Sequence, residues 1–346
     1  MMIDEKYMWR ALQLARLGAG HTSPNPMVGA VIVGPDGAII GEGWHRRCGQ
    51  AHAEVNAVAS VADATRLSSS TLYVTLEPCS HYGKTPPCAN LIIERGIRRV
   101  VVGTLDPFVK VAGRGVRMLQ EAGVEVTVGV LEQQCRELNR RFITAHTTGR
   151  PWVQLKWAQT ADGFIGLPPE DGENPLHMST PVTMRLMHRE RSLCDAIVVG
   201  AATARIDNPS LTTRYWPGRS PLRVVLSHEL TIPGNLKLLN DGHNSIVYNR
   251  VKSDVQGAVE YVKIEATAPQ AWLEDLYRRG VTSVMVEGGA QVLRQLIGEG
   301  LWDEARIEVS QRRASHGVPA PAIDGVIHSR VVIDGNMITT LRRISL

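Results

Sequence analysis

The sequence contains 346 residues, of which 43% are hydrophobic and 21% are charged, and its formal net charge is +4. These values are those of an ordinary globular protein, and the small net charge gives no argument for a nucleic-acid partner over an anionic small molecule. No stretch approaches the ~18 consecutive apolar residues of a membrane span, and the N-terminal stretch is amphipathic, unlike a secretory leader.

At roughly 100–200 residues per domain, the length predicts two domains. The five cysteines are an odd number and are scattered along the chain. This usage argues against a disulfide framework and favours a reducing compartment, so we expect the protein in the cytoplasm. In such a compartment, paired cysteines more often indicate a metal site or catalysis.

Strands and helices alternate along the first part of the chain. The predicted elements are, in order, a helix over 4–17, a strand over 27–34 with a hairpin partner over 38–44, a helix over 52–62, a strand over 71–76, a helix from 88, a strand over 98–105, a helix over 113–123 and a strand over 124–130. This alternation predicts a three-layer α/β domain over 1–145. The stretch "ITAHTTGRP" at 143–151 is rich in Thr, Gly and Pro, which predicts a linker.

A second series of strands and helices begins directly after this stretch. Its predicted elements are a strand over 152–160, a helix over 181–193, strands over 195–201 and 222–227, a helix over 269–279, a strand over 283–288, a helix from 290 and a strand over 304–310. The series predicts a second α/β domain, over 151–346.

One imidazole and two thiols stand at the ends of predicted elements in the first domain. His52 begins a predicted helix, Cys79 follows a predicted strand, and Cys88 opens the next helix. This ligand set suits tetrahedral Zn²⁺ with one position left for a water, which ionises near neutrality when bound. Glu54 is then placed to move the protons of that water without binding the metal. The sequence therefore predicts a zinc site with hydrolytic chemistry.

Other interpretations of these residues are open. A lone H-x-E is more often a pair on a helix surface, and two cysteines can be separate core residues. A closed structural zinc site would need a fourth ligand, for which Cys48 and His81 are candidates. The order of the motifs favours a different interpretation, since H-x-E, an apolar strand, P-C and a second Cys follow one another in zinc-dependent base deaminases.

The gap between the two cysteines is longer than in that general pattern, and it contains "SHYGKTPP" at 80–87. With "NPMVGAVIV" (25–33), "GEGWHRRCGQAHAE" (41–54) and "DPFVKVAGRG" (106–115), this loop closely resembles the deaminase domain of the bifunctional deaminase–reductases of riboflavin biosynthesis. The resemblance covers nearly all of residues 1–145. It implies a cytidine-deaminase-like fold and hydrolytic deamination of a diaminopyrimidine ribosyl phosphate.

The family's functional residues can be carried over to matching positions here. They imply zinc ligands at His52, Cys79 and Cys88, and a proton shuttle at Glu54. They also imply substrate contacts from Asn25, His45, His81, Lys84 and Asp106. The sequence departs from the family at Phe108 and Val109, where an Asn and a further Pro are usual.

Local signals in the second half are weaker. A strand ends at Gly200 and is followed by Thr203, Asp207 and Arg214. The stretch "VEGGAQVL" (286–293) has a glycine pair between a strand and a helix, which lets backbone N–H groups approach a phosphate, although such a turn is more often plain packing. No complete G-x-G-x-x-G is present, so a standard Rossmann site is not predicted.

In their order, these stretches resemble the reductase domain of the same family, which is similar in fold to dihydrofolate reductase. The family implies NADPH contacts at Ala158, Thr203, Asp207, Ser227, Gly288, Gly289, Ala290 and Gln291. It implies substrate contacts at Lys156, Arg191, Leu211, Arg214 and Glu287, with the two arginines as a phosphate clamp. The implied reaction is NADPH reduction of the ribosyl chain to a ribityl chain. Pro175 and His177 replace a Ser and a Trp of the family, and the part after Ser310 matches poorly.

Two other hypotheses stand beside a bifunctional enzyme. A nucleic-acid deaminase would need a basic, aromatic-lined channel, and only 5% of the residues are aromatic. Alternatively, the deaminase could be joined to a C-terminal module that only binds or dimerises. No Tyr or His proton donor stands out in the reductase half, where Lys156 or a water could serve. We expect small-molecule substrates and self-association into a dimer or tetramer.

Overall fold

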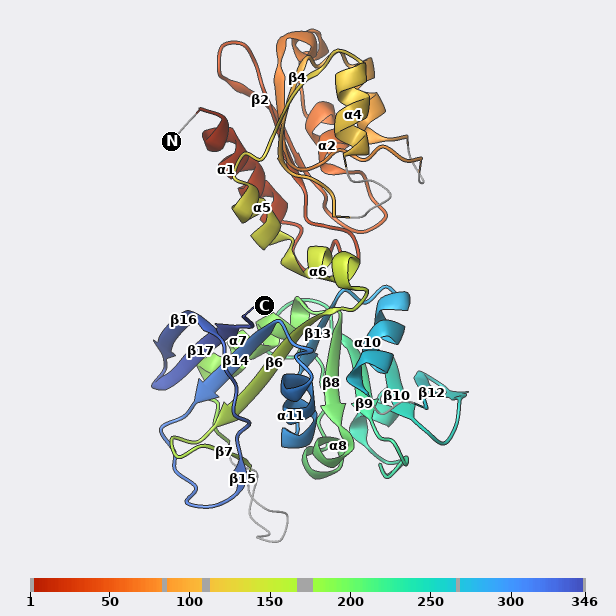
Figure 1. Ribbon diagram of the computed structural model, residues 1–346, viewed down its shortest axis with the longest axis vertical. Helices are drawn as coiled ribbons and strands as arrows, with labels where there is room; N and C mark the ends of the chain where they lie inside the picture. The colour runs from red at the N-terminus through yellow and green to blue at the C-terminus, as the bar shows by residue number, and fades with distance from the viewer. Residues whose placement is uncertain (1–2, 83–85, 108–112, 167–176, 266–267, 345–346) are drawn as a thin grey trace. The chain divides into compact units, whose positions relative to one another are not determined.

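The computed structural model describes residues 3–82, 86–107, 113–166, 177–265 and 268–344. By internal contacts the chain divides into two compact units, Met1–Gly149 and Arg150–Leu346 (Figure 1). Among the residues singled out from the sequence, four lie outside the described ranges: Lys84, Phe108, Val109 and Pro175.

The first unit is built on a five-stranded sheet with the order β2-β1-β3-β4-β5. Its strands are β1 (Gly29–Val33), β2 (Ile39–Trp44), β3 (Thr71–Leu76), β4 (Arg99–Thr104) and β5 (Glu125–Val128). β1 is antiparallel to both β2 and β3, whereas β3, β4 and β5 are parallel. Gly29 is required where β1 begins, because an added Cβ would collide with the backbone oxygen of Ala11 in α1.

Helices cover both faces of this sheet, as a three-layer domain requires. They are α1 (Ile3–Arg16), α2 (Ala53–Ala59), the short 3₁₀ helix η1 (Ala64–Ser69), α3 (Cys88–Glu94), α4 (Arg114–Glu121), α5 (Glu132–Leu138) and α6 (Arg140–Thr148). Alternate side chains of a strand point to opposite faces. In β3, Leu72 and Val74 therefore pack with α2, α3 and α4, while Tyr73 packs with α1 and α5 (Figure 1).

The predicted linker over 143–151 is wrong for most of its length. α6 continues to Thr148, and Gly149 ends it with a φ of 69°, the left-handed conformation that glycine adopts at helix ends. Ile143 and Ala145 are buried, which explains why this Thr-rich segment is helical. Tertiary packing of two apolar residues outweighs the local composition.

The second unit contains a ten-stranded sheet with the order β11-β12-β10-β9-β8-β13-β6-β14-β17-β16. The strands are β6 (Trp152–Gln159), β8 (Ala196–Gly200), β9 (Leu222–Leu226), β10 (Ser245–Asn249), β11 (Asp254–Gln256), β12 (Val259–Lys263), β13 (Ser283–Val286), β14 (Glu304–Val309), β16 (Val326–Ile333) and β17 (Asn336–Arg342). The seven from β12 to β14 are parallel, and β11, β17 and β16 are antiparallel to their neighbours. β7 (Phe164–Gly166) and β15 (Val318–Pro319) form a separate pair.

The helices of the second unit are α7 (Pro181–Ser192), α8 (Ala201–Asp207), α9 (Lys237–Asn240), α10 (Pro269–Arg278) and α11 (Ala290–Gly298). α10 and α11 pack with residues such as Val198 and Val286 on one face of the large sheet. α8 and α9 pack with Ile197 and Val199 on the other. The strands from β10 to β12 and the β16–β17 hairpin were not predicted.

None of the described helices combines the length and apolar composition that crossing a membrane requires.

Candidate active sites

A cavity of about 290 Å³ lies in the first unit. The residues predicted for the deaminase site that line it are Asn25, His45, His52, Glu54, Cys79, His81 and Asp106. They come from separate elements, because β3 ends before Cys79, α2 begins after His52, and Asp106 follows β4. The fold therefore gathers residues that are up to 81 positions apart in the sequence, from Asn25 to Asp106.

His52, Cys79 and Cys88 bring one nitrogen and two sulfurs together. His52 Nδ1 lies 3.6 Å from Cys79 Sγ and 3.3 Å from Cys88 Sγ, and all three atoms lie within 4.8 Å of one another. In a tetrahedral zinc site, ligand atoms about 2.1–2.3 Å from the metal are roughly 3.5–3.8 Å apart. The donor types and their spacing therefore fit one Zn²⁺.

Within the described ranges, no further His, Cys, Asp or Glu joins this set. Cys48, one candidate for a fourth ligand, has an exposed free thiol. His81, the other candidate, lines the cavity without belonging to the set. The closed structural site considered from the sequence is thus not formed by these residues, and three ligands leave one coordination position open.

Glu54 lies two residues after His52 on α2, and only 3% of it is exposed. Burial, helped by the negative charge of Cys79, raises the pKa of Glu54 to about 7. Hydrogen bonds from the Cys88 thiol and from His52 hold the pKa of Cys79 well below its usual range, so Cys79 is a thiolate at neutral pH. A buried carboxyl group therefore stands beside the ligand set without belonging to it.

Asn25 and His45 form a hydrogen-bonded pair on the wall of the cavity. The distance between Asn25 Nδ2 and His45 Nε2 is 3.2 Å, and His45 Nδ1 lies 3.1 Å from Ala51 O. Burial lowers the pKa of His45, which favours the neutral ring with Nδ1–H donating to Ala51 and Nε2 accepting from Asn25. Because the Asn25 amide nitrogen donates to His45, its oxygen can accept a hydrogen bond from a ligand in the cavity.

Glu77 also lines the cavity and was not predicted as a site residue. Its buried carboxylate accepts backbone N–H bonds from Asp106 (3.2 Å), Gly113 (2.9 Å), Gly115 (2.8 Å) and Val116 (3.2 Å). Glu77 therefore ties Asp106 to the beginning of α4. Its position in "EPC", two residues before the first predicted cysteine ligand, was the signal that could have found it.

Phe142 and His146 of α6 complete the cavity wall, and they too were missed. Their rings lie 4.4 Å apart in an edge-to-face arrangement, and burial lowers the pKa of His146. The missed signal is their spacing of four residues, which places two rings on one face of a helix. The Thr-, Gly- and Pro-rich composition of 143–151, which predicts a linker, masks this signal.

In the second unit, three residues predicted as substrate contacts form a buried charged cluster. Arg191 Nε and Nη2 donate to the Glu287 carboxylate at 2.7 and 2.6 Å. Burial lowers the pKa of Lys156, and the negative charges of Glu287 and Glu308 oppose that effect. Because Glu287 occupies the guanidinium of Arg191, this arginine is not a free half of the predicted phosphate clamp.

Arg214 and Leu211 lie on the segment that follows α8. Arg214 is exposed, and its backbone N–H donates to His188 Nδ1 at 2.9 Å. Burial and nearby arginine charges lower the pKa of His188 to about 4, so its ring is neutral and can accept that bond. The Leu211 side chain is 2% exposed and packs in the core, so only its backbone is placed to meet a ligand.

The predicted cofactor residues lie at one edge of the large sheet. They lie at the carboxyl ends of adjacent parallel strands: Ala158 is the last residue but one of β6, Thr203 follows β8, Ser227 follows β9, and Gly288–Gln291 follow β13. Nucleotides bind at this edge in open α/β sheets. Ser227 Oγ is buried without a hydrogen-bond partner among the described residues, and a Cβ on Gly289 would lie 3.0 Å from Thr203 Oγ1. These features fit a bound dinucleotide.

A His-Cys-Cys set beside a buried glutamate, on a three-layer α/β domain, is the arrangement of zinc-dependent base deaminases. The second unit has the sheet edge of a nucleotide-dependent reductase. Residues 1–104 match the cytidine and deoxycytidylate deaminase zinc-binding region, and residues 151–310 match the RibD C-terminal domain. The protein is therefore a zinc-dependent deaminase joined to a reductase.

Whole-chain relatives identify the family. Riboflavin biosynthesis protein RibD of Aquifex aeolicus is 38% identical over 323 residues, which cover 91% of this chain and 89% of the relative. RibD of Bacillus amyloliquefaciens is 41% identical, with coverage of 87% and 83%. A crystal structure of a diaminohydroxyphosphoribosylaminopyrimidine deaminase/5-amino-6-(5-phosphoribosylamino)uracil reductase from Thermotoga maritima has a TM-score of 0.89, 34% identity and 99% coverage of both chains. The chain belongs to the RibD family of bifunctional riboflavin-biosynthesis enzymes.

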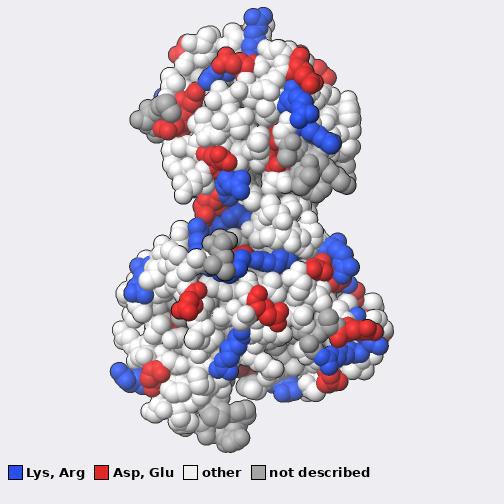
Figure 2. All heavy atoms as spheres, viewed as in Figure 1, with Lys and Arg blue, Asp and Glu red and all other residues white. Residues whose placement is uncertain are grey.

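These findings confirm the predicted fold, both activities and the zinc and NADPH cofactors. The second unit is a reductase domain and not the non-catalytic module considered above. The nucleic-acid deaminase is likewise not supported. On the face seen in Figure 2, the Lys and Arg side chains of the described residues are interspersed with Asp and Glu.

Proposed function

We propose that His52, Cys79 and Cys88 bind the catalytic zinc ion of the deaminase. The observation that carries this proposal is the convergence of their three ligand atoms within 4.8 Å, in a cavity that a substrate can enter. Zinc held by this set supplies Lewis acidity, which lowers the pKa of a coordinated water. The three ligands come from two helix starts and one strand end, so the fold presents them before the metal binds.

Glu54 is the proton carrier in this proposal. Its carboxyl group is buried beside the ligands and outside the ligand set, so it is close to the attacking water without holding the metal. Glu54 takes a proton from the water as oxygen bonds to the ring carbon. It then delivers a proton to the amino nitrogen as the carbon–nitrogen bond breaks and ammonia leaves.

The substrate of the deaminase site is, in this account, the diaminopyrimidine ribosyl phosphate named for the Thermotoga relative. Asn25, His45, His81 and Asp106 hold it, together with Lys84, which is three residues after His81 in the sequence. The Asn25 amide oxygen is placed to accept from a substrate amino group, because its nitrogen already donates to His45. This orientation distinguishes a ring edge that bears an amino group from one that bears a carbonyl.

For the reductase, we propose that NADPH occupies the sheet edge formed by Ala158, Thr203, Asp207, Ser227 and Gly288–Gln291, where it supplies hydride to the ribosyl carbon. Lys156, Leu211, Arg214 and Glu287 face the substrate. Arg214 is the arginine placed for the phosphate, since its exposed guanidinium donates to Ser210 Oγ at 3.1 Å and pairs with no carboxylate among the described residues. Arg191 instead holds Glu287 and Thr212 in place.

Gly289→Val should weaken NADPH binding by at least about tenfold, or about 1.4 kcal/mol. The φ of Gly289 is −55°, so the backbone accepts a side chain, but the new atoms fill the space beside Thr203. Fluorescence titration with NADPH measures the loss of affinity. The matched control is Gly234→Val, because nothing lies within 4 Å of a Cβ added there. Unchanged affinity in Gly289→Val would contradict the cofactor site, and thermal unfolding of the variant shows whether the second unit is folded.

We further propose that the protein self-associates through β16. This strand ends the order of the large sheet and exposes Val326, Ile327, Val331 and Val332. An edge strand that pairs antiparallel with its own copy gives a closed two-fold dimer. Val332→Lys, at a side chain that is 72% exposed, should shift the protein toward monomer in sedimentation. The same change at exposed Val255 of β11 is the control, and equal behaviour of both variants would contradict this interface.

A cytoplasmic location is also part of the proposal. It is supported by the five free cysteines, one of them exposed, since thiols persist in a reducing compartment. Cell fractionation with an antibody to the protein tests it, and recovery with exported proteins would contradict it.

A further inference from the structure

The segment from Asn208 to Arg214 joins α8 to the strand that follows, and its backbone is unusual. Asn208 has a φ of 40° and Leu211 a φ of 55°, which are left-handed conformations that residues with side chains rarely adopt. Leu211 has a branched side chain and no local polar group that favours this region. Such a conformation persists only where the surrounding structure imposes it.

Three buried side chains impose it, each holding one backbone atom at alternating residues. Arg223 Nη1 donates to Ser210 O at 3.2 Å, Arg191 Nη1 donates to Thr212 O at 3.2 Å, and His188 Nδ1 accepts from Arg214 N at 2.9 Å. Arg191 also belongs to the charged cluster of the reductase site, and the neutral His188 lies on the same helix, α7. Arg223 lies outside both, so it is the residue whose role is unexplained.

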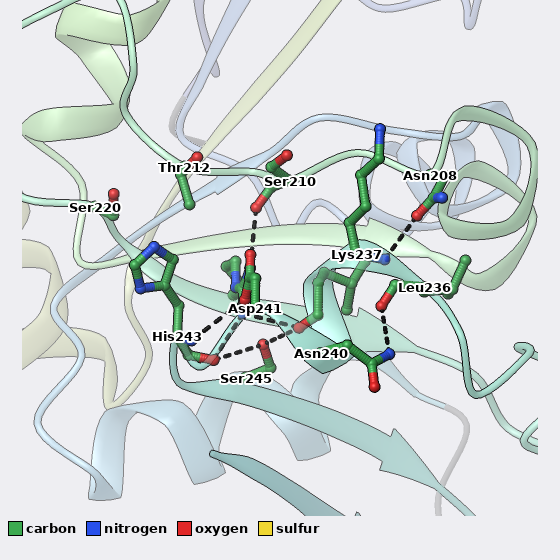
Figure 3. Close-up of polar contacts among 12 residues, drawn as sticks. Asn208, Ser210, Thr212, Ser220, Leu236, Lys237, Asn240, Asp241, His243 and Ser245 are labelled. Atoms are coloured by element: carbon green, nitrogen blue, oxygen red, sulfur yellow. Dashed lines mark hydrogen bonds and ion pairs between the residues drawn. The ribbon is translucent and has the colours of Figure 1, made fainter. Parts of the chain in front are cut away.

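Arg223 lies on β9 and is fully buried. Its guanidinium makes a two-fold ion pair with Asp241, at 2.6 and 2.7 Å, and donates to the backbone oxygens of Leu238 and His243 at 2.8 and 2.7 Å. These contacts fix the turn after α9, and Figure 3 shows Ser210, Asp241 and His243 gathered there.

A second contact joins the same two segments. Asn208 Oδ1 accepts from the backbone N–H of Lys237 at 2.8 Å, as Figure 3 also shows. The left-handed Asn208 is therefore anchored to α9 by its side chain, while Ser210 is anchored to it through Arg223. Both contacts hold the part of the segment before Leu211, and neither involves a residue with a proposed substrate or cofactor role.

We propose that Arg223, oriented by Asp241, is a positioning residue of the reductase, which sets the 208–214 segment so that Arg214 and the Leu211 backbone face the substrate. This inference rests on the proposed role of Arg214. Arg223 is fully buried and meets no ligand itself, so it acts only through the segment. A guanidinium suits the task because its rigid fork reaches several acceptors at once, which an ammonium group does not.

If Arg223 has this role, loss of its contacts should affect substrate binding and leave NADPH binding unaffected. Thr203 and Asp207 lie on α8, which ends before Asn208 and has its own contacts with β8 and β9. Loosening the segment should therefore raise the KM for the phosphoribosyl substrate and leave the affinity for NADPH unchanged. A purely structural role would instead reduce the folded fraction, which lowers kcat and the NADPH stoichiometry at an unchanged KM.

The test uses Asp241→Asn and Arg223→Lys in the full-length enzyme. Asp241 is the milder change, because its side chain is 31% exposed and Asn keeps its shape. The expected result in both variants is a rise of about tenfold or more in the reductase KM, equivalent to about 1.4 kcal/mol, with unchanged NADPH affinity and deaminase rate. Glu260→Gln is the matched control, since Glu260 forms a similar two-fold pair with Arg279 and its side chain is 39% exposed.

Arg214→Gln is measured in parallel, because it tests the proposed substrate contact of Arg214 separately from the positioning role of Arg223. If it raises KM while Asp241→Asn and Arg223→Lys behave like Glu260→Gln, the positioning role is overturned and the proposed site stands. If Arg214→Gln leaves KM unchanged, the proposed substrate contact is overturned, and the inference falls with it. A loss of kcat and NADPH stoichiometry at unchanged KM in Asp241→Asn would also overturn the inference.

Discussion

Glu54→Gln should lower the deaminase rate by about 10²–10⁴-fold, because the amide cannot carry the proton from water to the leaving ammonia. The substitution keeps the size of a side chain that is 3% exposed, so packing around it is preserved. Glu54 does not belong to the His52–Cys79–Cys88 set, so zinc content should stay at the wild-type level. Reductase kinetics in the same chain should also be unchanged.

The measurement combines an ammonia-release assay with metal analysis of the same preparation. The control is Glu94→Gln, which alters an exposed glutamate of α3 in the same unit. Loss of zinc together with activity in Glu54→Gln would make Glu54 a ligand and would contradict its role as proton carrier. Retention of the deaminase rate would contradict any catalytic role.

Cys88→Ser should lose both zinc and deamination. Cys88 opens α3 and is 1% exposed, and its sulfur lies 3.3 Å from His52 Nδ1. A serine hydroxyl is not ionised at neutral pH and is a poor zinc ligand, so two ligands remain where three are needed. The reductase should keep its rate, because its residues lie in the other unit.

A second buried cysteine provides the control for this experiment. Cys135 is fully buried in the core formed with α1, and burial raises its pKa to about 12, so it remains a thiol. Cys135→Ser changes the same atom at similar burial and should retain zinc and deaminase activity, apart from any loss of stability. If Cys88→Ser kept its metal, the ligand set proposed here would be wrong.

The candidate zinc site could be predicted because its signals are local. His52 and Glu54 stand at the beginning of a helix, Cys79 follows a strand, and Cys88 opens the next helix. The residue types and their spacing in the sequence are therefore enough to predict that they share one site. The pair formed by Arg191 and Glu287 lacks such a signal. These residues are 96 positions apart, and their ion pair follows only from the order of the strands in the sheet.

Two other elements show how local sequence signals relate to the structure: tertiary packing outweighs them in α6, and they agree with the turn between β16 and β17. In α6, a Thr-rich composition suggested a linker, although burial of Ile143 and Ala145 makes the segment helical. In the β16–β17 hairpin, Asp334–Gly335 between two apolar runs is a strong turn signal, and both residues have positive φ values of 50° and 84°. That hairpin is therefore predictable from local sequence alone, without any family similarity after Ser310.

The most direct test of a two-site enzyme is mass spectrometry of the diaminopyrimidine ribosyl phosphate after incubation with the purified protein, with and without NADPH. Without NADPH, the account predicts exchange of one amino group for oxygen and no further change. With NADPH, it predicts that this product also gains two hydrogens. Glu54→Gln should form neither product from this substrate, yet should reduce the deaminated compound when that is supplied. Deamination by wild-type protein without any NADPH-dependent gain of hydrogen would contradict the account.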